Sequence, residues 1–127
     1  MKGALPRLAI AAMLAPLACA AGELDAGALD RSILALRSSA QETRMLLDAS
    51  YAGQVTAAYA RVQREELAKQ VRDAAKPLDD PAPQPLAARA ANAKALAEKV
   101  SSALKDEDVH AAEAAERGLA SLAKGGK

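Results

Sequence analysis

Apolar residues that recur at alternating spacings of four and three most constrain how this chain folds. Because an α-helix has 3.6 residues per turn, positions spaced in this way form one stripe that must be buried against other helices. A first stripe runs through Leu29, Ile33, Leu36, Ala40, Thr43 and Leu47. A second, after a proline-rich stretch, runs through Leu86, Ala90, Ala93, Ala97, Val100 and Leu104. The pattern predicts an all-α protein.

Breaks in the stripes predict where the first two helices end. The first stripe fails near residues 49–54, at Gly53, and glycine is the usual residue just past a helix end. A second helix is expected from about Gln54 to Lys76. Its inward residues are predicted to be Val55, Tyr59, Val62, Leu67, Val71 and Ala74. Residues 77–85 contain four prolines and predict a semi-extended surface linker.

The C-terminal part predicts either two helices or one. Pro85 suits the first position of a third helix, and the acidic run Asp106-Glu107-Asp108 favours the start of a fourth, since acids stabilise helix N-termini. Its inward residues are predicted to be Ala112, Ala115, Leu119 and Leu122. The expected fold is an up-down-up-down four-helix bundle spanning residues 21–127. The alternative is one helix over residues 86–124, which gives a long helical hairpin.

The composition predicts a core of small side chains. The chain has no Phe or Trp and only two tyrosines, and alanine dominates its apolar positions. Alanine favours helix but buries little area, so the helices must approach one another closely. Single-stranded nucleic acids are bound largely by stacking on aromatic rings, which this chain nearly lacks. A nucleic-acid partner is therefore not expected.

Residues 1–20 have the pattern of a secretory signal peptide. Lys2 and Arg7 precede an apolar run of about a dozen residues, too short to span a bilayer, where about 20 are needed. Ala18-Cys19-Ala20 then predicts cleavage after Ala20, which leaves 107 of the 127 residues and no cysteine. The alternative is a small envelope lipoprotein acylated at Cys19. Either way we expect a periplasmic or secreted protein, with no transmembrane helix in the mature chain.

The mature chain is nearly neutral. Cleavage removes two of the 17 basic residues and none of the 16 acidic ones, which leaves 15 against 16. Such a chain has no overall field that would attract nucleic acid or anionic lipid. Its narrow alanine stripes leave open that two copies pair to complete a core, so a homodimer is possible.

The mature chain resembles the cytochrome b562 family in its length, export signal, helix pattern and central proline-rich loop. Local likenesses are Ala52-Gly53-Gln54-Val55, the stretch PLDDPAPQP, and Ala103-Leu104-Lys105 followed by VHAAEAAERGLASL. The resemblance implies a four-helix bundle and a periplasmic haem electron carrier. In that family, a methionine near the start of the first helix and a histidine near the end of the last hold the iron. This chain has neither residue at those places.

Met45 and His110 are the only methionine and histidine after residue 20, and they fall on the first and fourth predicted helices. They are therefore the candidate ligands for haem b. At 100° per residue, each lies about 160° from its helix's inward stripe. We expect both to face solvent, and thus no bound cofactor, with the haem carrier as the alternative.

No arrangement typical of catalysis or of metal binding is evident. Glu107 and His110 form an E-x-x-H pattern, but a di-iron bundle site needs two such motifs and two further glutamates. Adjacent carboxylates occur at Glu65-Glu66 and at Asp79-Asp80. Neighbouring residues on a helix point about 100° apart, so Glu65 and Glu66 do not converge on one proton. An enzyme is not expected.

The two tyrosines are the candidate anchors for a protein partner. Tyr51 and Tyr59 flank the predicted break at residues 49–54, and exposed aromatic rings are frequent binding hot spots. Each ring is expected to pack with its hydroxyl at the surface. The sequence as a whole predicts an exported, non-enzymatic helical bundle that binds or scaffolds an unknown partner in the cell envelope.

Overall fold

The computed structural model describes residues 22–125, which form four α-helices and one 3₁₀-helix. The elements are α2 (Ala26–Tyr51), α3 (Ala57–Ala75), the 3₁₀-helix η1 (Lys76–Asp79), α4 (Gln84–Asp106) and α5 (Val109–Gly125). The predicted all-α four-helix bundle is thereby confirmed. A turn at Glu107 and Asp108 separates α4 from α5, so the long hairpin is wrong. The predicted signal peptide and Cys19 lie outside the described residues.

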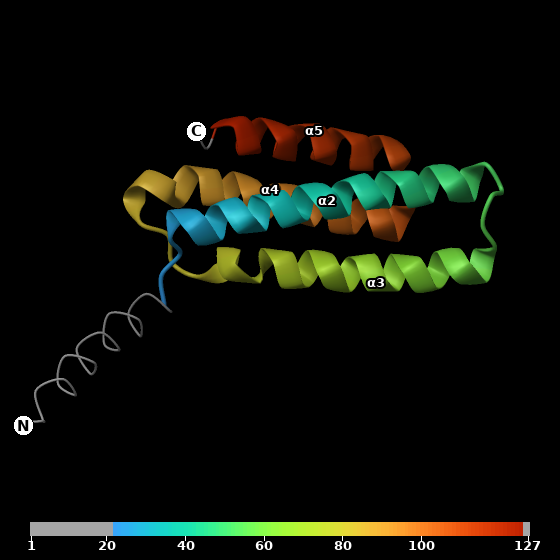
Figure 1. Ribbon diagram of the computed structural model, residues 1–127, viewed down its shortest axis with the longest axis horizontal. Helices are drawn as coiled ribbons and strands as arrows, with labels where there is room; N and C mark the ends of the chain where they lie inside the picture. The colour runs from blue at the N-terminus through green and yellow to red at the C-terminus, as the bar shows by residue number, and fades with distance from the viewer. Residues whose placement is uncertain (1–21, 126–127) are drawn as a thin grey trace, which may run out of the picture.

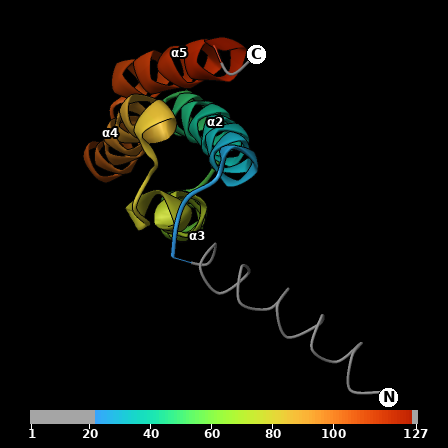
Figure 2. The same cartoon turned by 90° about the vertical axis from the view of Figure 1, so that its left-hand side faces the viewer.

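Sequential helices run antiparallel and pack side by side (Figure 1). Seen from one end, α3 and α5 lie at opposite corners with α2 and α4 between them (Figure 2). The α2–α3 connection and the α4–α5 turn share one end of the bundle. The α3–α4 connection and both ends of the described chain share the other. Within residues 22–125, no helix is both long enough and apolar enough to cross a membrane.

Large aliphatic side chains on α2 fill the interior, and alanines on α4 and α5 surround them. All six predicted inward positions of α2 are buried, and so are Ala93 and Val100 of α4. On α5, Ala112, Ala115 and Leu119 are fully buried, and Leu122 packs partly buried against the core. Small side chains let α4 and α5 lie close to α2, as the composition predicts. The core is consequently narrow.

Short polar side chains begin three of the helices. Asp25, Thr56 and Asp108 each accept a hydrogen bond from the backbone N–H three residues ahead, at 2.8, 3.1 and 3.1 Å. Each such cap satisfies an amide that the helix leaves unpaired and contributes about 1 kcal/mol. The acidic run thus starts α5 through Asp108, although the helix itself begins one residue later than the run.

Left-handed residues end α2 and α4. Gly53 has φ 72°, and the backbone N–H groups of Gly53 and Gln54 donate to Ser50 and Ala49, which closes a Schellman motif. Glu107 takes the same role after α4 at φ 55°, with the Asp108 N–H donating to the Ala103 carbonyl. Glycine adopts this conformation without strain, whereas the Cβ of a glutamate opposes it.

The predicted inward face of α3 is partly wrong. Tyr59 and Val62 are about half exposed, and the buried residues are Ala60, Leu67 and Val71. Counting back seven residues from Leu67 leads to Ala60, so the inward stripe runs through a small residue. The sequence prediction followed the larger side chains of Tyr59 and Val62 instead. The first half of α3 therefore presents little apolar volume to the core.

The predicted linker 77–85 is more structured than expected. Its first part continues from α3 as the 3₁₀-helix η1, and Leu78 is buried in the core. The Leu24 N–H donates to the Pro81 carbonyl at 2.9 Å, which ties the linker to the segment before α2. The four prolines predict a semi-extended surface linker, but burial of Leu78 outweighs that local preference.

Replacement of Thr43 by valine is expected to stabilise the bundle by about 1 kcal/mol. Thr43 is fully buried, and its Oγ1 has no hydrogen-bond partner among the described residues. An unsatisfied buried hydroxyl costs roughly 1–3 kcal/mol, and valine has nearly the same shape. Urea unfolding measures the change.

The matched control is Thr56→Val, the same substitution at the exposed cap of α3. It removes the hydrogen bond to the Tyr59 N–H, and about 1 kcal/mol of stability should be lost. A loss of stability in both variants would contradict the assignment of Thr43 as an unsatisfied group.

Candidate functional site

Met45 and His110 lie on the surface of the bundle and do not form a ligand pair. Met45 is 55% exposed, and the side chain of His110 is 91% exposed. A haem iron held between helices needs both groups to point into the interior. His110 instead places its Nδ1 3.5 Å from Glu113 Oε1, one turn along the same helix. These residues therefore do not fit a haem buried in this bundle.

The other groups singled out for chemistry also lie apart. Glu107 Oε2 lies 3.8 Å from Arg64 Nη2, and Asp79 Oδ1 lies 3.0 Å from Lys94 Nζ, so each pairs with a base. Glu65, Glu66 and His110 are exposed. Within residues 22–125, no three histidine, cysteine or acidic side chains gather closely enough to hold a metal ion. The E-x-x-H pattern remains a feature of one exposed helix start.

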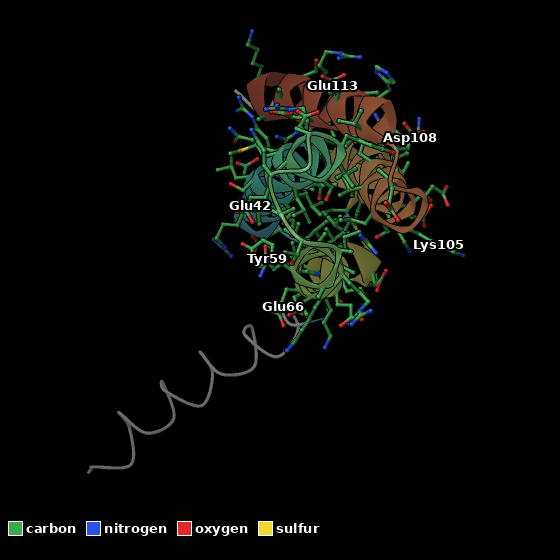
Figure 3. The ribbon with its side chains drawn as sticks, turned by 90° about the vertical axis from the view of Figure 1, so that its right-hand side faces the viewer. Glu42, Tyr59, Glu66, Lys105, Asp108 and Glu113 are labelled. Carbon is green, nitrogen blue, oxygen red and sulfur yellow. The ribbon has the colours of Figure 1, made fainter. Side chains whose placement is uncertain are left out.

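Both tyrosine rings are exposed, so the expectation that each ring packs is wrong, and among the described residues only the Tyr51 hydroxyl has a hydrogen-bond partner. Tyr51 is 67% exposed and its hydroxyl donates to the Glu107 carbonyl, which joins the end of α2 to the α4–α5 turn. Tyr59 is 51% exposed on the first turn of α3. Figure 3 places Tyr59 on the side of α3 nearer Glu42, and Lys105 on the other side.

A groove follows α3, beginning beside the α2–α3 connection and continuing along the interface between α3 and α4. It consists of three neighbouring cavities of about 490, 230 and 520 Å³. Arg61 and Arg64 line both the first and the second cavity, and Ser101 lines both the second and the third. We call this set of cavities the α3–α4 groove. Its apolar lining residues are Val55, Ala57, Ala60, Ala68, Val71, Ala75, Ala97 and Leu104.

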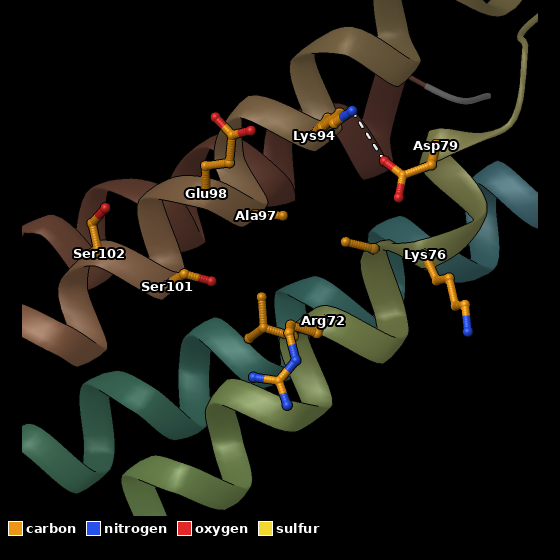
Figure 4. Close-up of a pocket in the computed structure, with 10 residues that line it drawn as sticks. Arg72, Lys76, Asp79, Lys94, Ala97, Glu98, Ser101 and Ser102 are labelled. Atoms are coloured by element: carbon orange, nitrogen blue, oxygen red, sulfur yellow. Dashed lines mark ion pairs between the residues drawn. The ribbon is translucent and has the colours of Figure 1, made fainter.

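The groove exists because small side chains meet where the two helices face each other. The inward stripe of α3 runs through Ala60 and then Arg64, whose side chain is 26% exposed. Opposite lie Ala97 and Ser101 of α4, which face α3 across the hollow in Figure 4. Alanine and serine do not span the space between two helix axes. The α3–α4 interface is therefore incompletely filled.

An ion pair bridges the two walls at one end of the groove. Lys94 Nζ lies 3.0 Å from Asp79 Oδ1, as the dashed line in Figure 4 marks. The hydrogen bond to Asp79, and then its charge, raise the pKa of Lys94 above its ordinary value. A base with a raised pKa contributes its stabilisation below its unfolded pKa and loses it only as the pH rises through the raised value. The bridge is thus present at neutral pH.

On the side of the bundle away from the groove, hydrogen bonds and close side-chain packing join the helices. Arg44 Nε of α2 donates to Glu116 Oε1 of α5 at 2.8 Å, and this bond raises the pKa of Arg44. Arg89 of α4 donates through Nη2 to the Leu122 carbonyl at 2.9 Å and through Nη1 to Asp30 at 2.8 Å. Leu96 packs close to Gly118, where a Cβ would meet its methyl group at 2.8 Å. These contacts hold α5 against both α2 and α4.

Sequence reasoning did not predict the groove. The first half of α3 has alanine or arginine at four of the positions that line the groove, namely Ala57, Ala60, Arg61 and Arg64. Counting heptads backward from Leu67 rather than forward from Val55 would have placed these residues on the inward face. Small and charged residues at such positions indicate that the helix packs incompletely against its neighbour.

Comparison with protein-family models, with curated proteins and with solved structures finds no significant match. The likeness to the cytochrome b562 family therefore rests on the sequence features given above.

Replacement of Tyr51 by phenylalanine is expected to destabilise the protein by about 0.5–1.5 kcal/mol, because the hydroxyl's bond to the Glu107 carbonyl is lost. Tyr59→Phe removes a hydroxyl that bonds to none of the described residues, and it should leave the unfolding free energy unchanged. Thermal unfolding of both variants measures the difference. Equal effects would argue against the link between α2 and the α4–α5 turn.

Proposed function

We propose that this chain is an exported, non-enzymatic helical-bundle protein that binds a partner protein in the cell envelope. Export rests on the basic start, short apolar run and Ala18-Cys19-Ala20 site of its first 20 residues. In this proposal the signal peptide is cleaved, so Cys19 is lost and the mature protein acts in the periplasm or outside the cell.

The α3–α4 groove is the observation on which the binding role depends. Isolated exposed apolar residues are ordinary, but an extended apolar hollow rimmed by charge is typical of an interaction surface. The apolar surface still open in the groove is that of Val55, Ala57, Ala68 and Ala75, which are exposed or half-buried, and an occupant would bury it. A stabilising contribution of about 25 cal/mol for each Å² of apolar surface buried favours such an occupant.

The distribution of reactive groups supports a binding role over a catalytic one. The carboxylates at Asp79 and Glu107 pair with bases, and the single histidine lies in solvent beside Glu113. Met45 and His110 face outward, so the proposal includes no resident haem. Tyr51 lies next to the groove through its bond to Glu107 and supplies an exposed ring at that end.

Site-specific photo-cross-linking tests the proposal. A benzophenone amino acid replaces Ser102, an exposed serine of α4 that lines the groove. The control carries it at Ser121, an exposed serine of α5 that lines none of the cavities described above. Both variants keep the first 20 residues. Illumination of intact cells is expected to give a discrete adduct from position 102 and none from position 121.

The intact mass of the exported variants checks the first step of the account. A chain that begins at Ala21 is expected, and a diacylglycerol adduct on Cys19 would show the lipoprotein instead. If position 102 gives no adduct, or the same adducts as position 121, then the groove is not where a partner binds. A Soret band in the purified protein would favour the haem carrier.

A further inference from the structure

We infer that the occupant of the α3–α4 groove is an acidic amphipathic helix contributed by the partner. This inference rests on the proposed function and specifies the chemistry of the partner. Three observations support it: the length of the groove, the fact that the backbone groups of its walls are already hydrogen-bonded, and the excess of unpaired basic over unpaired acidic residues along its rim.

The dimensions of the groove favour an elongated occupant. Its lining extends from Ala57 at the start of α3 to Lys76, the first residue of η1, which at 1.5 Å per residue is about 28 Å. A compact ligand would occupy only one of the three cavities. An α-helix of about five turns matches the whole length, and alanines on the floor allow it to approach closely, as in helix–helix packing.

The walls of the groove offer no backbone hydrogen-bond partners to an extended peptide. Both walls are α-helices, whose backbone N–H and C=O groups bond within their own helix except at the ends. A bound strand would therefore bury its own backbone groups without partners, at a cost of roughly 1–3 kcal/mol for each. A helix satisfies its backbone internally and offers only side chains to the alanine floor.

The charges along the rim favour an acidic occupant. The groove is lined by six basic and four acidic residues: Arg61, Arg64, Arg72, Lys76, Lys94 and Lys105 against Glu65, Asp79, Glu98 and Glu107. Two of the bases pair with two of the acids, Arg64 with Glu107 and Lys94 with Asp79. Among the described residues, four bases and two acids on the rim then remain outside any ion pair.

This surplus contrasts with the rest of the molecule. The mature chain has 15 basic and 16 acidic residues, so the surface outside the groove is acidic overall. Glutamates and aspartates on the flanks of a partner helix would meet Arg61, Arg72, Lys76 and Lys105. Such pairs at the edge of an interface mainly increase the association rate and determine which partner binds, and they weaken with salt.

Two designed peptides provide the probe. Both have 18 residues and alanine and leucine at positions spaced three and four apart; one has glutamate and the other lysine at the flanking positions. Fluorescence anisotropy is measured with the mature protein. The glutamate peptide is expected to bind and to bind more weakly as salt increases. The lysine peptide, and a scrambled glutamate peptide without the apolar stripe, should bind at least ~10-fold more weakly.

A matched pair of double variants locates the binding. Arg61→Glu with Arg72→Glu reverses two rim charges and should weaken the glutamate peptide at least ~10-fold. Lys69→Glu with Lys99→Glu makes the same change at exposed positions of α3 and α4 that line no part of the groove, and it should leave binding unchanged. Circular dichroism verifies that each variant is folded.

Three results would overturn the inference: equal binding of the two peptides, equal effects of the two double variants, and a stable dimer that closes the groove with a second copy. Sedimentation of the protein alone tests the third. A groove adduct in cells without binding of the glutamate peptide would leave the proposed function standing and this inference wrong. Binding of the peptide without any adduct would show that the groove accepts an acidic helix, and it would contradict the proposal that a partner binds there in cells.

Discussion

Packing of large aliphatic side chains on α2 against alanines on α4 and α5 is the interaction on which the rest of the structure depends. Leu29, Ile33, Leu36 and Leu47 have almost no contact with solvent, and alanines at 0% exposure face them. Because alanine contributes little buried area, the stabilisation must come from close approach of the helix axes. A single helix with large side chains can form such contacts with only some of its neighbours.

The incomplete packing of α3 follows from this constraint. It lies at the corner opposite α5, contacts α2 and α4, and has only three buried residues, one of them an alanine. The bundle gains little from α3's first half, and the space beside it remains open. The groove beside it is lined by six bases and four acids, which is why we propose that a further helix binds there. The proposed binding role thus rests on the distribution of side-chain sizes rather than on any motif.

The sequence predicted the parts of the fold that depend on regular spacing of large residues. The α2 stripe, the break at Gly53 and the start of α5 at Asp108 follow from periodicity and from the chemistry of helix ends. The register of α3 did not, since Tyr59 and Val62 are large and apolar yet point outward. The groove was missed for the same reason: it consists of small residues that two distant segments bring together, which one-dimensional patterns do not reveal. The burial of Leu78 was likewise decided by tertiary packing.

The most direct test of the account is to enlarge one small residue that lines the groove and one that is fully buried on α5. Ser101→Leu places a large side chain in the α3–α4 groove, and Ala115→Leu places the same side chain on α5 where no space exists. Urea unfolding should show Ser101→Leu within about 0.5 kcal/mol of the parent protein, and Ala115→Leu destabilised by about 1–3 kcal/mol, the usual cost of overpacking. If Ser101→Leu is as destabilising as Ala115→Leu, then α3 and α4 are closed against each other and there is no groove for a partner to enter.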